Sequence, residues 1–95
     1  MPDNIISSEK LTKYFSVTKA ALAKAEVAVN PTRASEGKEI LDMVNHYVSD
    51  AGFFRDKDDF VNAFAALNYA HGWLDTGARL GIFDVDDSDL FVVKN

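Results

Sequence analysis

Residues 60–81 show the clearest periodic pattern of apolar positions in the chain. Apolar or small residues recur there at alternating spacings of four and three, with His71 in the same series: Phe60, Phe64, Leu67, Leu74, Ala78 and Gly81. This spacing predicts a helix with one face turned towards a core. A second apolar strip follows the opposite side of the same helix, at Ala66, Tyr69, Trp73 and Leu80. The pattern therefore predicts a helix that more than one neighbour must cover.

Two amphipathic segments precede this region. Residues 8–29 carry apolar positions at the same four-three spacing, and a serine at position 7 or 8 suits the N-cap of a helix. Pro31 fits the first turn of a helix and pushes the residue before it out of helical geometry. We therefore predict a first helix over residues 8–29 and a second that begins at Pro31, with Ser35 as a competing N-cap.

Glycine and aspartate mark the expected ends of the second and third helices. Gly52 should terminate the second helix, because glycine adopts the left-handed conformation of a C-terminal cap without steric penalty. Asp56 can then cap the third helix, and Gly81 can end it. The predicted helices cover residues 31–52 and 57–80.

Short connections between these segments determine the expected fold class. Helices of about 20–24 residues joined by a few residues must run antiparallel to their neighbours. We predict an all-α fold, an antiparallel up-down-up three-helix bundle that forms a single domain over residues 1–95. A stripe of small residues on the third helix should allow another helix to approach closely: Ala63, Ala66, Ala70 and Gly77.

The tail, residues 82–95, is apolar at both ends with an acidic turn between them. Its last apolar run, residues 90–93, is too short for a stable isolated helix. We predict an extended C-terminal arm packed on the third helix, over the strip of Tyr69, Trp73 and Leu80. Burying such side chains contributes about 1.5–3 kcal/mol each, so either the tail or another subunit should cover them.

Composition restricts the classes of function. The chain has no cysteine, which excludes disulfides, thiolate zinc sites and cysteine nucleophiles and is typical of a reducing cytoplasm. Its first residues lack the basic end and apolar core of a signal peptide, and no apolar run is long enough to cross a membrane. We expect a cytoplasmic protein with no membrane partner. The formal net charge of −5 makes nucleic acid an unfavourable partner.

The charge is unevenly distributed along the chain. Residues 1–38 carry six basic and four acidic side chains, a net charge of +2, whereas residues 39–95 carry four basic and eleven acidic ones, a net charge of −7. The first helix is basic through Lys10, Lys13, Lys19 and Lys24. These lysines form an ordinary solvated face, or they meet an acidic partner or the acidic end of a second copy.

Candidate chemistry is sparse. No phosphate-binding loop, nucleophile elbow or zinc-binding helix motif occurs, so we expect neither an enzyme nor a cofactor. His71 and Asp75 lie four residues apart, as do Asp42 and His46. The four would form a two-histidine, two-carboxylate metal site only if the rotation of the helices brought them together. The ordinary interpretation of His71 is a structural, hydrogen-bonded histidine.

The segment NAFAALNYAHGWLDTGARLG, residues 62–81, resembles the signature helix of an archaeal family, domain of unknown function 357. The resemblance includes the basic first helix, the YAHGWLD block at residues 69–75 and the closing DLFVV at residues 89–93. It implies a compact three-helix bundle and an archaeal cytoplasmic source. It implies no activity.

We therefore expect a non-catalytic protein interaction module that self-associates or docks a partner protein. The expected interaction surface combines the third-helix strip with the tail: Tyr69, Trp73, Leu80, Leu90 and Phe91. One alternative is a small-ligand or metal-binding domain centred on His71, with Asp42, His46 and Asp75. Another is weak association with RNA through the lysines of the first helix.

Overall fold

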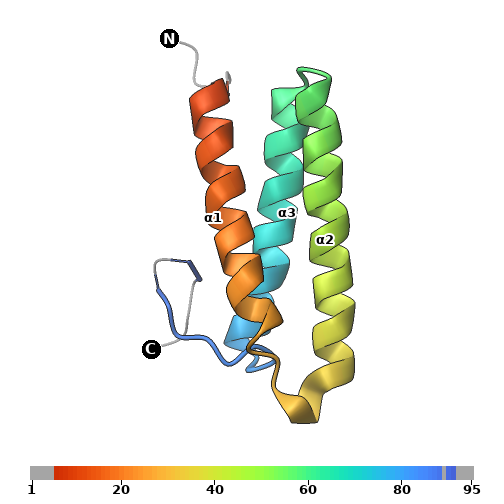
Figure 1. Cartoon of the computed structure of the whole chain (residues 1–95), viewed down its shortest axis with the longest axis vertical. Helices are drawn as coiled ribbons and strands as arrows, with labels where there is room; N and C mark the ends of the chain where they lie inside the picture. Colours follow the sequence, from red (N-terminus) through yellow and green to blue (C-terminus); the bar gives the residue numbers. More distant parts are fainter. Residues whose placement is uncertain (1–5, 89, 92–95) are drawn as a thin grey trace.

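The computed structural model describes residues 6–88, 90 and 91 and confirms the predicted fold class. Its helices are α1 (Ser8–Glu26), a short 3₁₀ turn η1 (Pro31–Arg33), α2 (Ala34–Asp56) and α3 (Phe60–Arg79). Successive helices run in opposite directions and form an antiparallel bundle (Figure 1). The terminal residues 1–5 and 92–95 of the predicted domain lie outside the described residues.

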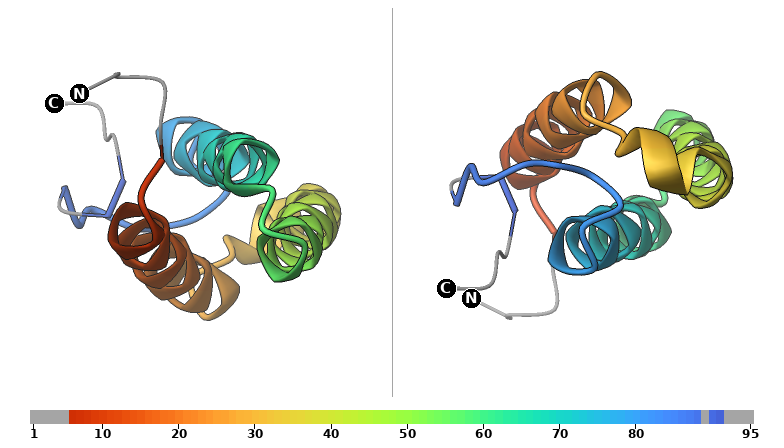
Figure 2. Two further views of the ribbon diagram at one scale, coloured as in Figure 1. Left: turned by 90° about the horizontal axis from the view of Figure 1, so that it is seen from above. Right: turned by 90° about the horizontal axis from the view of Figure 1, so that it is seen from below.

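The helix α3 is the central element of the bundle. Both α1 and α2 pack extensively on α3 and touch each other much less, and Figure 2 shows the three helices at the corners of a triangle. The predicted stripe of small residues, Ala63, Ala66, Ala70 and Gly77, is buried. Small side chains let two neighbouring elements approach the same helix, and this accounts for the central position of α3.

The core has two parts along the length of the bundle. Leu11, Phe15 and Leu67 belong to the part near the start of α1 and α3. Leu22, Val44 and Leu74 belong to the part at the other end, where the tail also enters. Buried apolar side chains along the full length make the molecule a single packed unit.

The helix α1 ends earlier than predicted, at Glu26 rather than residue 29. The backbone of the next residues pairs with the tail instead: Asp84 N–H donates to Ala28 C=O at 2.8 Å, and Val29 forms an antiparallel bridge with Phe83. Asn30 N–H also donates to Ile82 C=O at 2.8 Å. These bonds satisfy backbone groups that a longer helix would have used internally. Ser7 caps the start of α1, as predicted, by accepting a hydrogen bond from Lys10 N–H.

The prediction that Gly52 ends the second helix is wrong, because α2 continues to Asp56. Asp58, with φ of 60°, occupies the left-handed position instead. Asp58 N–H donates to Arg55 C=O and Asp59 N–H to Phe54 C=O, which together form a Schellman cap. Asp59, and not Asp56, then caps α3.

The helix α3 ends as predicted. Gly81 has φ of 75°, and its N–H donates to Ala78 C=O while Ile82 N–H donates to Gly77 C=O. This second Schellman cap turns the chain back onto the bundle. Phe83 then packs directly on Gly77 and is fully buried.

The tail does not cover the strip of Tyr69, Trp73 and Leu80, contrary to the prediction. After Phe83 it crosses the end of the bundle and lies beside α1, on the side away from α2 (Figures 1 and 2). Asp87 forms an ion pair with Lys24 of α1. A turn follows, in which Leu90 and Phe91 N–H donate to Asp87 C=O, so the described part of the arm is not extended throughout.

Phe91 explains the path of the tail. Its side chain is only 2% exposed and belongs to the same core cluster as Leu22 and Ala25 of α1. Docking an aromatic ring in this cluster buries far more apolar surface than laying it on a half-exposed strip. The strip on α3 is therefore left open by the described part of the tail.

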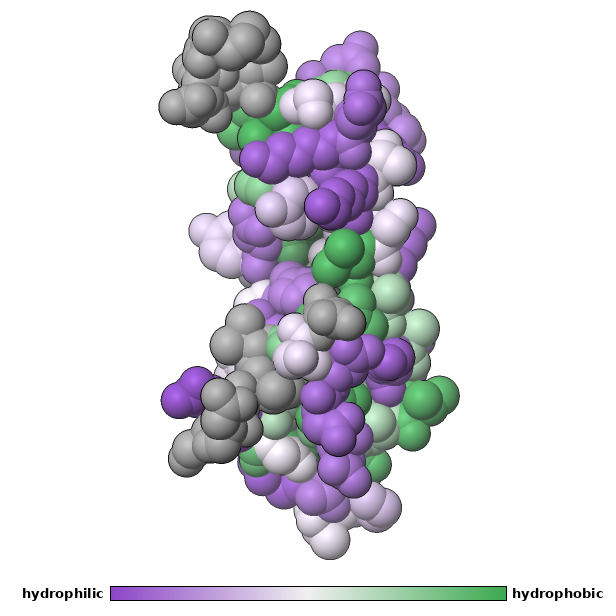
Figure 3. Space-filling view, turned by 90° about the vertical axis from the view of Figure 1, so that its left-hand side faces the viewer, coloured by the Kyte–Doolittle hydropathy of each residue, from purple (hydrophilic) through white to green (hydrophobic). Residues whose placement is uncertain are grey.

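Figure 3 shows the face formed by α1 and the tail. Hydrophilic side chains cover much of it, and hydrophobic ones appear in separate patches. Among the residues that the structure describes, every helix is too short or too polar to cross a lipid bilayer.

Candidate functional site

An open groove of about 740 Å³ runs between α2 and α3. Its floor is apolar and its α2 side carries carboxylates, and the lining residues are Glu36, Glu39, Ile40, Asp42, Met43, His46, Trp73, Thr76, Leu80 and Ile82. Trp73 is 39% exposed and Leu80 58% exposed, whereas Ile40 and Ile82 are buried. The groove therefore offers both a buried floor and accessible apolar side chains.

Aromatic side chains extend this apolar surface along the bundle. Tyr69 lies one turn before Trp73 on α3 and stacks on Tyr47 of α2, with 5.6 Å between ring centroids. It remains 63% exposed. Exposed aromatic residues of this kind are enriched in the centres of protein interfaces.

Gly72 lies beside Trp73 on the outer surface of α3. A Cβ atom built on Gly72 would have no neighbour within 4 Å, so packing within the described chain does not require glycine there. Glycine inside a helix costs about 0.5–1 kcal/mol relative to alanine. The open backbone at Gly72 leaves room for another molecule to approach next to the indole of Trp73.

The carboxylates on the α2 side give the groove its polarity. Glu36, Glu39 and Asp42 line it, and its lining contains no lysine or arginine. Asp42 pairs with Lys38 at 3.0 Å and Glu36 with Arg33, both on the surface. The hydrogen bond from Arg33 and its positive charge lower the pKa of the Glu36 carboxyl, and the same pair raises the pKa of Arg33.

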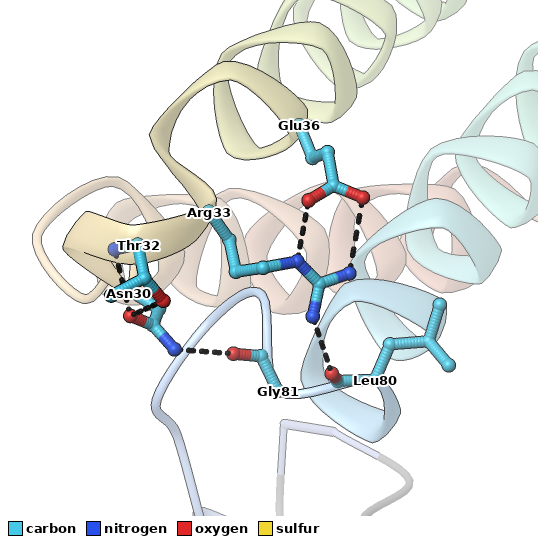
Figure 4. Close-up of polar contacts among 6 residues, drawn as sticks. All are labelled: Asn30, Thr32, Arg33, Glu36, Leu80 and Gly81. Atoms are coloured by element: carbon cyan, nitrogen blue, oxygen red, sulfur yellow. Dashed lines mark hydrogen bonds and ion pairs between the residues drawn. The ribbon is translucent and has the colours of Figure 1, made fainter.

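A network of polar contacts holds one end of this groove in place, where the start of α2 meets the C-terminus of α3 (Figure 4). Arg33 donates from Nε and Nη2 to the two carboxylate oxygens of Glu36, and its Nη1 donates to Leu80 C=O at 3.3 Å. Asn30 accepts from Thr32 N–H at 3.0 Å and donates from Nδ2 to Gly81 C=O at 3.4 Å. The connection before α2 is thus tied to the C-terminus of α3, which fixes the position of Leu80.

The four residues considered for a metal site do not come together. Asp42 and His46 lie on the groove, whereas His71 and Asp75 line a smaller cleft of about 280 Å³ between α1 and α3, with Tyr14, Val17, Thr18, Asn68 and Gly72. His71 Nε2 lies 3.5 Å from Asp75 Oδ1. Within residues 6–88, 90 and 91, no three histidine, aspartate or glutamate residues are grouped closely enough to hold a metal ion.

The five residues of the expected interaction surface are also divided. Tyr69, Trp73 and Leu80 are accessible on the α2 side of α3. Phe91 lies in the core and Leu90 packs against it, partly buried. Leu90 and Phe91 therefore contribute to stability on the α1 side and are not part of the groove.

Three lysines of α1, Lys10, Lys19 and Lys24, are exposed and make local contacts. Lys10 lies over the ring of Phe64 and Lys19 over that of Phe15, each 5.7 Å from the ring centroid. Lys24 pairs with Asp87 of the tail. These three lysines partly cover aromatic rings and pair with the tail.

The match to a protein family covers most of the bundle. Residues 13–83 match the family model described as "Protein of unknown function (DUF357)". The chain belongs to the DUF357 family. The resemblance noted for residues 62–81 is thus confirmed, and the matched region of this DUF357 member contains every residue that lines the groove. No curated protein and no solved structure matches the chain.

Sequence reasoning missed the contribution of α2 to the groove. Glu36, Glu39, Met43 and His46 follow one another at spacings of three or four residues and so share one side of α2. Of these, only His46 had been considered as a site residue. The sequence offered one signal for this surface, which is the apolar residue Met43 on an otherwise polar side of the helix. In the structure Met43 is 40% exposed.

Proposed function

We propose that this protein is a non-catalytic interaction module that docks a partner protein in the groove between α2 and α3. The observation that carries the proposal is the position of Trp73. Its indole is half-exposed on an apolar floor that the described part of the tail leaves uncovered. Large aromatic residues at the centre of an open apolar groove act as anchors for partners.

Rigidity of the groove supports this function. The side chains of the groove stand on two long helices, and the contacts of Arg33 and Asn30 fix its end at the start of α2. A preformed surface loses little conformational entropy when a partner binds.

We place this role in the cytoplasm, and the support is compositional. A chain without cysteine suits a reducing compartment, where disulfides do not contribute to stability. The resemblance of residues 62–81 to an archaeal family favours an archaeal host.

Photo-crosslinking in the host cell tests the proposal. Benzoylphenylalanine replaces Tyr69, next to Trp73, and in a matched control it replaces Tyr14, an aromatic residue on α1 that is 36% exposed. We expect a discrete crosslinked partner from position 69 and none from position 14. The additional substitution Trp73→Ala should abolish the crosslink. Equal crosslinking from both positions, or a crosslink from position 69 that persists without Trp73, would refute the proposal.

A further inference from the structure

We infer that the groove between α2 and α3 binds a basic amphipathic helix of a partner protein. This inference rests on the proposed function and specifies the chemistry of the partner. Three features of the groove support it: its length, the sign of its charges and the poor fit of a second copy of the chain.

The length of the groove matches a short helix. Its lining residues on α2 run from Glu36 to His46, and at about 1.5 Å per residue this corresponds to about 15 Å, or three helical turns. On α3 the lining runs from Trp73 to Leu80. A helix that lies between two antiparallel helices presents apolar anchors at positions i, i+3 or i+4, and i+7. Trp73, Met43 and Leu80 provide the apolar surface for such anchors.

The charges select a basic partner. Glu36, Glu39 and Asp42 line one side of the groove, with no lysine or arginine in the lining. The nearby pairs of Glu36 with Arg33 and of Asp42 with Lys38 are exposed to solvent. Exposed pairs contribute little stability, so lysines or arginines of a partner can replace their cations readily. A partner with acidic flanks would instead place like charges against this side.

A second copy of the chain fits the groove poorly. A symmetric dimer through this surface would place the carboxylates of both copies in one interface, and the groove lining supplies no lysine or arginine to pair with them. The basic helix α1 of a second copy has the right charge, but its large exposed apolar side chains are Tyr14 and Val27. These are about 20 Å apart along the helix, too far to act as consecutive anchors.

Peptide binding followed by the fluorescence of Trp73, the single tryptophan, tests the inference. One peptide is a helix with leucines at i, i+3, i+4 and i+7 flanked by lysines. The other has the same leucines with glutamates in place of the lysines, and neither contains an aromatic residue. We expect the basic peptide to shift Trp73 emission to shorter wavelengths and to bind at least about tenfold more tightly than the acidic one. Added salt should weaken this binding.

Two charge reversals test whether the basic peptide binds beside the carboxylates of the groove. Glu39→Lys, in the groove, should weaken binding of the basic peptide by about tenfold. Glu9→Lys, on α1 at the other end of the bundle from Glu36, makes the same charge change and should leave binding unaltered. Circular dichroism verifies the fold of both variants, and Glu39→Gln provides a milder substitution should Glu39→Lys unfold.

The outcomes separate this inference from the proposed function. Equal affinity for the two peptides would overturn the inference but leave a docking groove in place. If neither peptide shifts the emission while crosslinking from position 69 still depends on Trp73, a partner of different chemistry is bound and the inference fails. Self-association that Trp73→Ala abolishes, detected by sedimentation of the protein alone, would identify a second copy as the occupant and would also overturn it.

Discussion

Two glycines of the same helix should respond in opposite ways to replacement by alanine. Gly72 and Gly77 both lie inside α3, so each replacement should gain about 1 kcal/mol of helix propensity. A Cβ atom at Gly72 meets nothing within 4 Å, whereas one at Gly77 would lie 2.5 Å from Cδ2 of Phe83 and closer still to its Cε2. Nonbonded carbon atoms prefer about 3.5–4.0 Å, so the Phe83 ring must move.

The cost of moving Phe83 decides the result. The ring is 1% exposed and belongs to the core cluster, so moving it disturbs the packing of its neighbours. Overpacking of this kind costs about 1–3 kcal/mol, and complete expulsion of a phenylalanine costs about 3–5 kcal/mol. Because the added Cβ would lie so close to the ring, we expect a cost in the upper part of the overpacking range, about 2–3 kcal/mol. After the gain in propensity of about 1 kcal/mol is subtracted, Gly77→Ala should destabilise the protein by about 1–2 kcal/mol. Gly72→Ala should stabilise it by about 0.5–1 kcal/mol.

Thermal and urea unfolding of the two variants measure this difference. A domain of this size changes its Tm by about 4–8 °C per kcal/mol, so the two variants should differ by about 6 °C or more. Combining Gly77→Ala with Phe83→Leu should recover part of the loss, because the smaller side chain relieves the same contact. Equal Tm values for the two alanine variants would show that Phe83 does not pack on α3 as described.

Three further predictions follow from single residues. Asp58→Gly should raise the free energy of unfolding by about 1 kcal/mol in urea titrations, because Asp58 holds a left-handed conformation that glycine adopts without penalty; a loss of stability would contradict this. Phe91→Ala should lower the free energy of unfolding by about 3–5 kcal/mol, because the ring is only 2% exposed. An unchanged Tm of this variant would show that the tail is not docked. Because Arg33 lowers the folded-state pKa of Glu36, the ionised carboxylate stabilises the protein above the unfolded-state pKa, and this contribution disappears as pH falls through the lower folded-state pKa. Glu36→Gln should therefore reduce the decline of Tm on acidification, and identical pH profiles of Glu36→Gln and wild type would contradict this assignment.

The bundle itself could be predicted from the sequence because its signals are local and repeated. Apolar spacing defined three helices, and the caps at Ser7 and Gly81 depend on residues within one turn. The errors at helix ends have tertiary causes. Ala28 and Val29 are compatible with a helix, but their backbone pairs with the tail, a contact between residues far apart in sequence.

The end of α2 shows how local preference can be overridden. Gly52 is a strong helix terminator, yet α2 runs through it. Phe54, two residues further on, packs against the core cluster that contains Ala51 and Leu67. Continuing the helix buries more apolar surface than ending it at glycine would. The left-handed position then falls to Asp58, which sequence alone did not single out.

The position of the tail was not predictable because both sides of α3 offered apolar surface. Periodicity identified the strip of Tyr69, Trp73 and Leu80 correctly but not which segment would cover it. The choice depended on the core pocket that receives Phe91 and on the pairing of Asp87 with Lys24. For the same reason, the rotation of α2 that places Asp42 and His46 on the groove, away from His71, could not be deduced.

An NMR titration with the basic peptide tests the central claim most directly. The account predicts that the indole N–H resonance of Trp73 shifts together with the amides of α2 from Glu36 to His46 and of α3 from Trp73 to Leu80. The resonances of α1 should stay in place. Shifts concentrated on α1 or the tail, with the Trp73 indole unmoved, would contradict it.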